Sequence, residues 1–348
     1  MRKKIFSVLT LLLLLAPAAL APWRVDMPAS RADAAQTDFL SAPLSFVEER
    51  LALKTLLITL RAKALSLWGD SGSDQVIAGR EDFLFYGDTL ADYQQSAPLS
   101  QAELDALADG LARLHQAFQA ENRGFILLIA PNKNSIYPEY MPARLLPGPG
   151  ESDLSRLQNA LDARGVPYLD AREILLAAKG KGLVYSKRDT HWNARGAWAV
   201  YQALTEYLPG VKTPAAQQPV FLPGQAGDLL LLCQPGGDPT EPDAQPELER
   251  SYRALRPIRS LYDLRIETAS SASALSLLVL RDSFGEGLFP YLANLTGRMT
   301  YSRIYDAPLA QARKAQAAMV ILEIAERNLK NLSHALEEVS TDGRMIPP

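Results

Sequence analysis

Residues 124–130, Gly124-Phe125-Ile126-Leu127-Leu128-Ile129-Ala130, form a short apolar run without alternation of hydrophobic and polar side chains. Such a run is typical of a strand that is covered on both faces, as in a parallel sheet. A second run of this kind, Leu275 to Leu280, lies far downstream. Strands predicted at 166–169, 299–305 and 319–324 alternate with helices predicted at 153–164, 171–179, 196–208, 308–316 and 328–339. This alternation predicts an α/β domain with a mainly parallel central sheet.

The helix that precedes the first apolar run is the clearest in the chain. It is predicted from about Ser100 to Asn122, because leucines recur at helical spacing and Ser100 followed by Glu103 forms a capping box. By contrast, residues 209–257 are rich in Pro, Gly and Gln, with one apolar island at Leu229 to Leu232. We interpret them as an irregular excursion over the surface of a domain that extends from residue 74 to about residue 345.

Composition excludes several classes of protein. The 348-residue chain carries 36 basic and 39 acidic side chains without a basic patch, which argues against a nucleic-acid partner. Residues 1–35 hold five of the basic and two of the acidic residues, so the remainder carries 31 against 37. Cys233 is the only cysteine, which excludes an intramolecular disulfide and a cysteine-rich metal site.

The N-terminus resembles a secretory signal. Three basic residues, Arg2 to Lys4, precede an uncharged apolar run from Ile5 to Ala21. Small residues at 19–21 and at 32–34 offer two cleavage sites, and a retained membrane anchor is the alternative. We therefore expect residues 1–35 to be a signal peptide or anchor and residues 36–73 to be a helical connector. The catalytic domain is then expected outside the cytoplasm, in the periplasm or on the outer face of the membrane.

A carboxylate and an imidazole lie two residues apart in Ser186-Lys187-Arg188-Asp189-Thr190-His191-Trp192-Asn193. In an extended backbone Asp189 and His191 point to the same side, and the carboxylate can orient the ring as a general base. Two other interpretations remain open: two ligands of a metal ion, or a histidine that merely staples a loop. The two further histidines, His115 and His334, fall on predicted helices and are expected at the surface or half-buried.

A nucleophile for this base is available at Ser283. It follows the second apolar run in Leu278-Val279-Leu280-Arg281-Asp282-Ser283-Phe284-Gly285, before a predicted helix start. The hydroxyl would be exposed there, and the backbone N–H groups that follow could face an oxyanion. Loops at the carboxyl ends of strands form the site in open α/β sheets, so Asn132 and Lys133 are plausible lining residues. Four aromatic residues, Tyr86, Tyr137, Trp192 and Trp198, either stack on the rings of a ligand or belong to the core.

Four stretches carry a resemblance to a known family. They are Asp189-Thr190-His191-Trp192-Asn193 with Gly196-Ala197, Gly79 to Asp88, Pro131 to Pro142, and Arg281-Asp282-Ser283-Phe284. In this order they resemble the SGNH-hydrolase-like proteins of bacterial exopolysaccharide O-acetylation, which are the alginate O-acetyltransferase family and its DHHW relatives. The resemblance covers roughly residues 45 to 340.

The resemblance implies a three-layer SGNH-hydrolase-like fold and a triad of Ser283, His191 and Asp189. It also implies acetyl transfer to a polysaccharide, without metal or cofactor, alongside a membrane-bound O-acyltransferase that supplies acetyl groups. An esterase with the same triad and a non-catalytic polysaccharide-binding subunit are the alternatives. The pair is Asp-x-His rather than Asp-x-x-His, precedes the serine, and is accompanied by Arg281 where many members have Gly. The residues expected to bind substrate are Asn132, Lys133, Tyr137, Asn193 and Arg281.

Overall fold

The computed structural model describes residues 71, 73–211, 219–222, 227–233, 243–246 and 249–340. The predicted signal or anchor at residues 1–35 and most of the helical connector predicted at residues 36–73 lie outside these residues. No helix within the described ranges is long and apolar enough to cross a membrane.

A central sheet of seven strands confirms the predicted α/β class. Its order is β4 (Tyr168–Asp170), β3 (Gly124–Ala130), β11 (Met319–Ala325), β9 (Ser276–Leu280), β10 (Arg298–Ser302), β8 (Arg265–Ala269) and β7 (Arg253–Ala254). The pairs from β4 to β10 are parallel, whereas β8 and β7 run antiparallel at one edge. The sheet is therefore mainly parallel, as predicted. Strand β8, which lies next to the edge strand β7, was not predicted, because only Ile266 and Thr268 of its five residues are buried.

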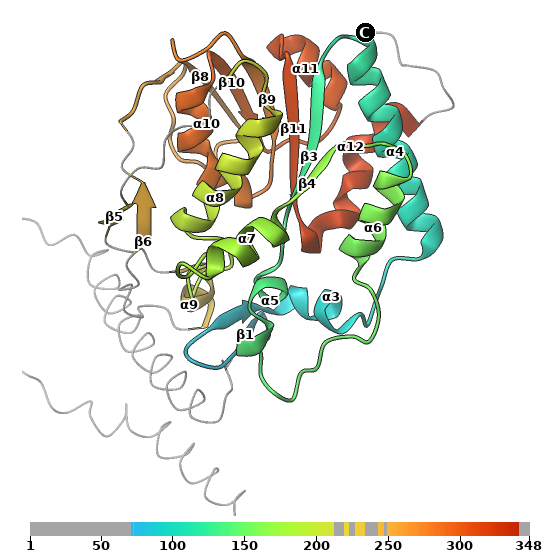
Figure 1. Cartoon of the computed structure of the whole chain (residues 1–348), viewed down its shortest axis with the longest axis vertical. Coiled ribbons are helices and arrows are strands. Elements are labelled where there is room, and N and C mark those ends of the chain that lie inside the picture. Colours follow the sequence, from blue (N-terminus) through green and yellow to red (C-terminus); the bar gives the residue numbers. More distant parts are fainter. Residues whose placement is uncertain are drawn as a thin grey trace, which may run out of the picture. The chain divides into compact units, whose positions relative to one another are not determined.

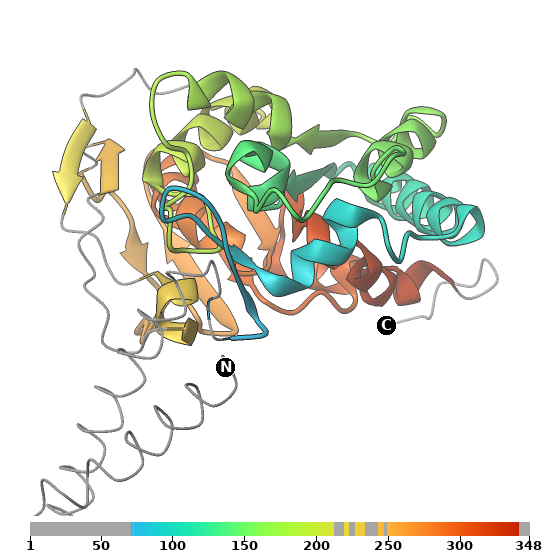
Figure 2. The same ribbon diagram turned by 90° about the horizontal axis from the view of Figure 1, so that it is seen from below.

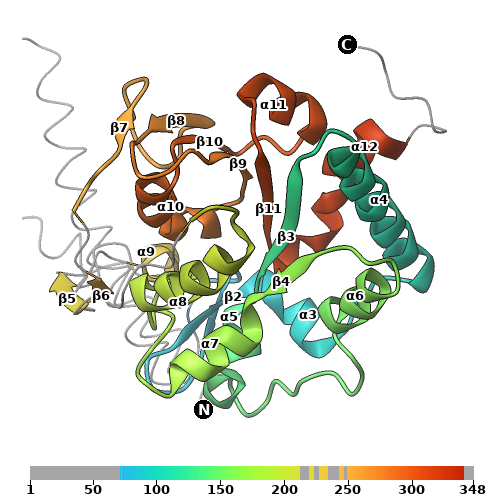
Figure 3. The ribbon, with the colours of Figure 1, turned by 45° about the horizontal axis from the view of Figure 1, so that its top comes forward.

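Helices cover both faces of the sheet and give three layers (Figures 1 and 3). One face packs against α4 (Gln101–Ala120), α6 (Asp153–Asp162), α11 (Pro308–Ala315) and α12 (Leu332–Ser340). The other packs against α7 (Ala171–Lys179), α8 (Ala194–Leu204) and α10 (Phe289–Leu295). Successive residues of β3 alternate between the two cores: Ile126 and Leu128 in one, Leu127 and Ile129 in the other. Because both faces are buried, the sequence of the strand shows no polar alternation.

The predicted capping box is present at the start of α4. The Ser100 hydroxyl accepts a hydrogen bond from the Glu103 N–H at 3.2 Å, and the Glu103 carboxylate accepts one from the Ser100 N–H at 2.7 Å. These bonds satisfy backbone donors that have no partner inside the helix, so the first turn begins where the sequence predicts it.

Short elements gather at the end of the sheet where the parallel strands finish (Figures 1 and 2). The hairpin of β1 (Val76–Ala78) and β2 (Leu84–Tyr86) contacts α9 (Asp228–Cys233). The other short elements are η1 (Gly87–Thr89), α3 (Leu90–Gln94), α5 (Lys133–Ile136), η2 (Pro138–Tyr140), η3 (Thr205–Tyr207), η4 (Phe284–Leu288) and η5 (Glu326–Asn331). Within the predicted excursion, β5 (Pro219–Leu222) and β6 (Asp243–Pro246) pair antiparallel, and α9 contains the whole apolar island.

Candidate active site

The turn that carries Ser283 is fixed by a buried carboxyl group on the neighbouring strand. Glu323 of β11 is fully buried, and its Oε2 accepts hydrogen bonds from the N–H groups of Asp282 at 3.0 Å and Gly285 at 3.2 Å. The Phe284 N–H donates to Asp282 Oδ1 at 2.9 Å. The expectation that the N–H groups after Ser283 face an oxyanion is therefore wrong for Phe284 and Gly285. Among the described residues, none accepts a hydrogen bond from the N–H of Ser283 itself.

The Asp282 side chain also ties this turn to the end of β11. Its Oδ2 accepts hydrogen bonds from the Ala325 N–H at 2.8 Å and from Asn328 Nδ2 at 3.0 Å. Because β9 and β11 are parallel neighbours, the turns that follow them meet at one edge of the sheet. The nucleophile is thus held by backbone and side-chain bonds on both sides.

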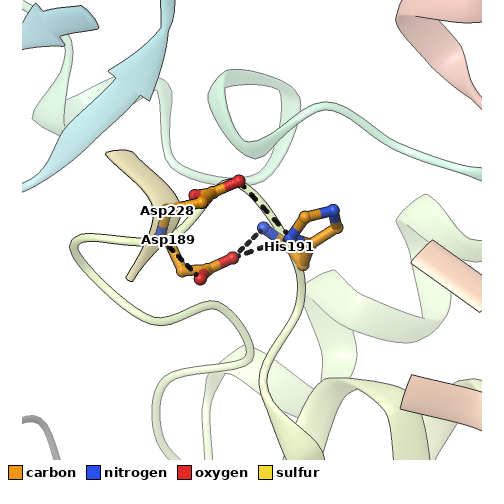
Figure 4. A group of neighbouring side chains, drawn as sticks. All are labelled: Asp189, His191 and Asp228. Carbon is orange, nitrogen blue, oxygen red and sulfur yellow. Dashed lines mark hydrogen bonds and ion pairs between the residues drawn. The ribbon is translucent and has the colours of Figure 1, made fainter. Parts of the chain in front are cut away.

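Asp189 and His191 lie in a loop between α7 and α8 rather than at the end of a sheet strand. The only strand-like pairing in this loop is an isolated bridge between Tyr185 and Trp192, so the pair does not lie on a strand of the sheet. The two side chains nevertheless meet, since Asp189 Oδ1 lies 2.8 Å from His191 Nδ1 (Figure 4). The same oxygen accepts the His191 N–H at 2.8 Å, which closes the turn locally.

The loop that carries Asp189 and His191 meets the turn that carries Ser283 at the imidazole ring. His191 Nε2 lies 2.8 Å from Ser283 Oγ, so a proton on Nδ1, held by Asp189, leaves Nε2 free to accept the serine hydroxyl. The ring of Phe284 lies edge-on to the imidazole at 5.0 Å between centroids and limits its tilt. The structure brings together the three residues predicted as a triad, in an arrangement that can activate a hydroxyl for nucleophilic attack.

The electrostatic surroundings favour a charged imidazole. Burial alone would lower the pKa of His191, but the hydrogen bond and charge of Asp189, together with the charge of Asp228, raise it above its ordinary value. Burial would likewise raise the pKa of Asp189, yet its contacts with His191 keep that pKa below the ordinary value. The pair therefore favours an ionised Asp189 and strengthens His191 as a proton acceptor, which is the direction that a general base requires.

A second carboxylate, from α9, joins the pair and was missed by the sequence analysis. Asp228 Oδ2 lies 3.7 Å from His191 Nδ1, and the Asp228 N–H donates to Asp189 Oδ2 at 3.0 Å (Figure 4). Asp228 Oδ1 in turn accepts the Thr190 N–H at 2.7 Å. A β-carbon on Gly227 would lie 2.1 Å from the Arg188 carbonyl oxygen, so glycine permits this approach. The apolar island was the available sequence signal, but it did not show where α9 docks.

The metal-binding interpretation has a geometric basis, since ligand atoms of Asp189, His191 and Asp228 lie within 4.8 Å of one another. However, His191 Nδ1 is the atom that bonds Asp189, so a metal ion there would break the link that orients the ring. Both carboxylates already accept backbone N–H groups, which is how a protein stabilises an anion without a cation. The residues therefore fit a hydrogen-bonded triad better than a metal site.

Ser283 and His191 open into a pocket of about 380 Å³. Its walls come from the β1–β2 hairpin and η1, the loop that carries Thr190 and His191, α9, the turn that carries Ser283, and η5. The lining residues are Tyr86, Asp88, Thr190, His191, Asp228, Leu232, Ser283, Arg327 and Asn328.

Comparison with known proteins agrees with this geometry. The family described as "SGNH hydrolase-like domain, acetyltransferase AlgX" matches residues 76–252, which is just over half of the chain. The chain belongs to this family. Its predicted resemblance is thereby confirmed.

Curated relatives and solved structures extend the comparison. The chain is 28% identical over 198 residues to the probable alginate O-acetylase AlgJ of Pseudomonas aeruginosa, covering 53% of the chain and 47% of that protein. It is 30% identical over 140 residues to the AlgJ of Pseudomonas syringae pv. tomato, covering 39% and 34%. The chain thus spans less than half the length of these relatives. Bacillus cereus PatB1 (TM-score 0.56, 14% identity, 73% and 96% covered) and a DHHW family protein of Eubacterium siraeum (0.52, 14%, 66% and 88%) share the fold.

Three of the family-motif residues expected to bind substrate are instead buried braces. Lys133 is 4% exposed, and its Nζ donates to the carbonyl oxygens of Leu84 at 2.8 Å, Lys187 at 2.6 Å and Asp189 at 2.7 Å. Asn132 and Tyr137 are each 1% exposed. None of the three lines the pocket, because their polar atoms hold neighbouring segments in place.

These braces connect several elements. Asn132 Nδ2 donates to Asp92 at 3.1 Å, the Asn132 N–H donates to Glu326 at 2.7 Å, and the Tyr137 hydroxyl accepts the Val184 N–H at 2.9 Å. These three residues brace backbone and do not line the pocket, so their contact with substrate stays a prediction. A polar loop residue that braces backbone has the same sequence signature as one that binds a ligand.

Asn193 and Arg281 are also structural. Asn193 caps α8, accepting the Gly196 N–H at 3.0 Å and donating to the Leu183 carbonyl at 2.8 Å. Arg281 is 0% exposed and pairs with Glu286 at 3.1 Å over the ring of Tyr301. At a position where many family members have Gly, this chain therefore has a buried, paired cation beneath the turn that carries Ser283.

Of the four aromatic residues considered for sugar stacking, only Tyr86 lines the pocket. Tyr137 and Trp192 are buried, and Trp198 packs against Tyr201 and Tyr291. The core interpretation therefore holds for three of them.

Proposed function

We propose that this chain is a serine-dependent O-acetyltransferase that transfers acetyl groups to hydroxyls of a polysaccharide outside the cytoplasm. The observation that carries the proposal is the continuous hydrogen-bonded chain from Asp189 through His191 to Ser283, with 2.8 Å at each link, at the mouth of a pocket. Family membership supports acetyl as the acyl group. The relatives named as probable alginate O-acetylases support a polysaccharide acceptor.

In the first step, Ser283 Oγ attacks the carbonyl carbon of an acetyl donor while its proton moves to His191 Nε2. The carbon–oxygen bond to the leaving group then breaks, and the leaving group takes that proton. An acetyl ester of Ser283 remains. Asp189 stays ionised and stabilises the imidazolium that forms in between.

In the second step, His191 Nε2 accepts the proton of a sugar hydroxyl, whose oxygen attacks the acetyl carbon. The bond to Ser283 Oγ breaks, and the serine recovers its proton from His191. The product is an acetylated sugar and free enzyme. The Ser283 N–H donates no hydrogen bond to any described residue, and it is one donor for the oxyanion of both steps.

A carbohydrate acetyl-esterase is the second candidate, and one observation favours it. The His191 side chain is 26% exposed, so water can reach the base that would otherwise activate a sugar hydroxyl. Both candidates use the same acetyl-serine and differ only in the second acceptor.

The test uses the purified full-length chain with 4-nitrophenyl acetate, with and without neutral and acidic oligosaccharides. Acetylated oligosaccharide in the mass spectrum would support transfer, whereas acetate release that ignores the acceptor would support the esterase. Ser283→Ala should lower either activity by at least about 10³-fold, while Ser333→Ala, at an exposed helix position, should not. Full activity of Ser283→Ala would contradict both candidates, and sugar binding without turnover would support a non-catalytic subunit.

Location and partner are part of the same proposal. The basic residues 2–4 and the apolar run 5–21 support export, and a membrane-bound O-acyltransferase would supply the acetyl groups. A C-terminal fusion to alkaline phosphatase, which is active only outside the cytoplasm, tests export. The N-terminal sequence of the mature protein would separate a cleaved signal from an anchor. An inactive fusion would count against this location.

A further inference from the structure

Arg327 is the one permanently cationic side chain among the described residues that line the pocket. Its guanidinium lies over the rings of Tyr86 and Phe284, 5.5 and 5.1 Å from their centroids. The guanidinium forms no hydrogen bond or ion pair with any described residue, and its Nη1 is buried without a partner. Arg281, by contrast, is paired with Glu286. A guanidinium that is held in place by rings but not neutralised is suited to bind an anion.

The proposed reaction produces an anion that the backbone alone does not satisfy. When Ser283 Oγ adds to the acetyl carbon, the carbonyl electron pair moves to oxygen, and such an oxyanion usually receives two or more hydrogen bonds. The N–H groups of Phe284 and Gly285 already donate to Asp282 and Glu323. Only the N–H of Ser283 remains from this turn, so a second donor has to come from another element.

The fold places Arg327 near this position. Register pairs Leu280 of β9 with Leu322 of β11, so the turns after both strands meet at the same edge of the sheet. The ring of Phe284 contacts both the guanidinium, at 5.1 Å, and the imidazole of His191, at 5.0 Å. The neighbouring Asn328 is a weaker candidate, because its Nδ2 already donates to Asp282.

We propose that Arg327 binds the oxyanion of the tetrahedral intermediate, as the second donor beside the Ser283 N–H. This inference rests on the proposed acetyl-serine chemistry. The guanidinium donates hydrogen bonds without losing a proton. The electron pair returns to the carbonyl when the leaving group departs with the proton of His191. Because Phe284 and Tyr86 hold the guanidinium beforehand, little reorganisation is needed during the reaction.

The experiment compares full-length wild-type protein with Arg327→Gln and Arg327→Lys on 4-nitrophenyl acetate, whose acetyl and leaving groups are uncharged in the ground state. We expect kcat to fall by about 100-fold in the Gln variant, with KM changed less than about threefold, and a smaller loss in the Lys variant. Added guanidinium ion should restore part of the activity of Arg327→Ala. Lys330→Gln is the matched control, because it removes an exposed cation of the same η5 that does not line this pocket.

Methylboronic acid provides a second measurement, since its adduct with a serine is tetrahedral and anionic. Its inhibition constant should rise at least about tenfold in Arg327→Gln, and thermal unfolding of both variants would report on folding. The inference is overturned if the folded Gln or Lys variant keeps kcat within twofold and binds the boronate as wild type does. It is also overturned if the loss appears only as a higher KM for an acidic acceptor. Activity in Ser283→Ala would instead refute the proposed function itself.

Discussion

The two sides of the candidate active site are built in different ways. Ser283 follows a buried central strand, and its turn is bonded to Glu323 and Asp282 directly beneath it. His191 lies in a loop with no place in the sheet, and that loop is held by Lys133 and by α9. Ser283 is therefore positioned by the core of the fold, whereas the loop of His191 is held by Lys133 of α5 and by the Asp228 N–H of α9. Changes that release the loop of His191 should affect chemistry and stability together, whereas changes beneath Ser283 that keep its hydrogen bonds should affect activity less.

Removing the brace of the base loop should have the largest effect. Lys133→Met deletes hydrogen bonds to three carbonyl groups, and we expect a loss of roughly 3 kcal/mol in the free energy of unfolding. At temperatures where the variant is folded, kcat should still fall at least about tenfold, because the loop that positions Asp189 beside His191 loses its support. Chemical denaturation and steady-state kinetics measure the two effects. Lys181→Met, at an exposed position of the same region, is the control. Unchanged kcat in folded Lys133→Met would show that α9 alone positions the loop.

Neutralising the second carboxylate should have an intermediate effect. The groups that face His191 are Asp189 on its own loop, Asp228 on α9 and Arg327 on η5. Asp228 raises the pKa of His191, so Asp228→Asn should lower that pKa. Activity requires neutral His191 and rises with pH through this pKa, so the acid limb of kcat/KM should move to lower pH.

The plateau of the Asp228→Asn profile should drop only several-fold, because Asp189 still orients the ring. The exposed pocket residue Asp88 offers a comparison, and Asp88→Asn should leave the acid limb in place. An unshifted limb in Asp228→Asn would limit Asp228 to a structural role.

Substitution of Glu323 by Gln, beneath the turn that carries Ser283, should have the smallest effect on activity. Burial, reinforced by the charge of Asp282, raises the pKa of Glu323 well above its ordinary value, so the folded protein keeps a proton on Glu323 to higher pH than the unfolded chain does. The unfolded chain ionises Glu323 above about pH 4.5, which lowers the stability of the folded state as pH rises from there. Glu323→Gln keeps an oxygen acceptor and does not titrate. Its melting temperature relative to wild type should therefore increase from pH 5 to pH 8, with kcat within about tenfold.

Glu323→Ala should instead destabilise at every pH, because two buried N–H groups lose their acceptor. If Gln and Ala behaved alike, the hydrogen bonds of Glu323 would not be what fixes the turn.

The sequence predicted those features of the fold and site that depend on residues close to one another in the chain. The central strands, the capped helix α4 and the pairing of Asp189 with His191 follow from local spacing and burial, and all are present. It could not predict Asp228 or Arg327, because their places depend on how α9 and η5 dock. Nor could the sequence show whether Lys133 supports neighbouring backbone or binds substrate. The three carbonyl groups that accept its hydrogen bonds lie 49 to 56 residues away in the chain.

The docking of Asp228 on Asp189 joins positions 39 residues apart, and the link from His191 to Ser283 spans 92. Contacts between such distant positions form only after much of the intervening chain has been ordered. Catalytic competence is thus acquired late, after the sheet that carries the nucleophile can already be in place. Under the proposed function, turnover would therefore measure complete folding. A molecule whose α9 has not yet docked would look folded by its helix content and still lack a properly oriented His191.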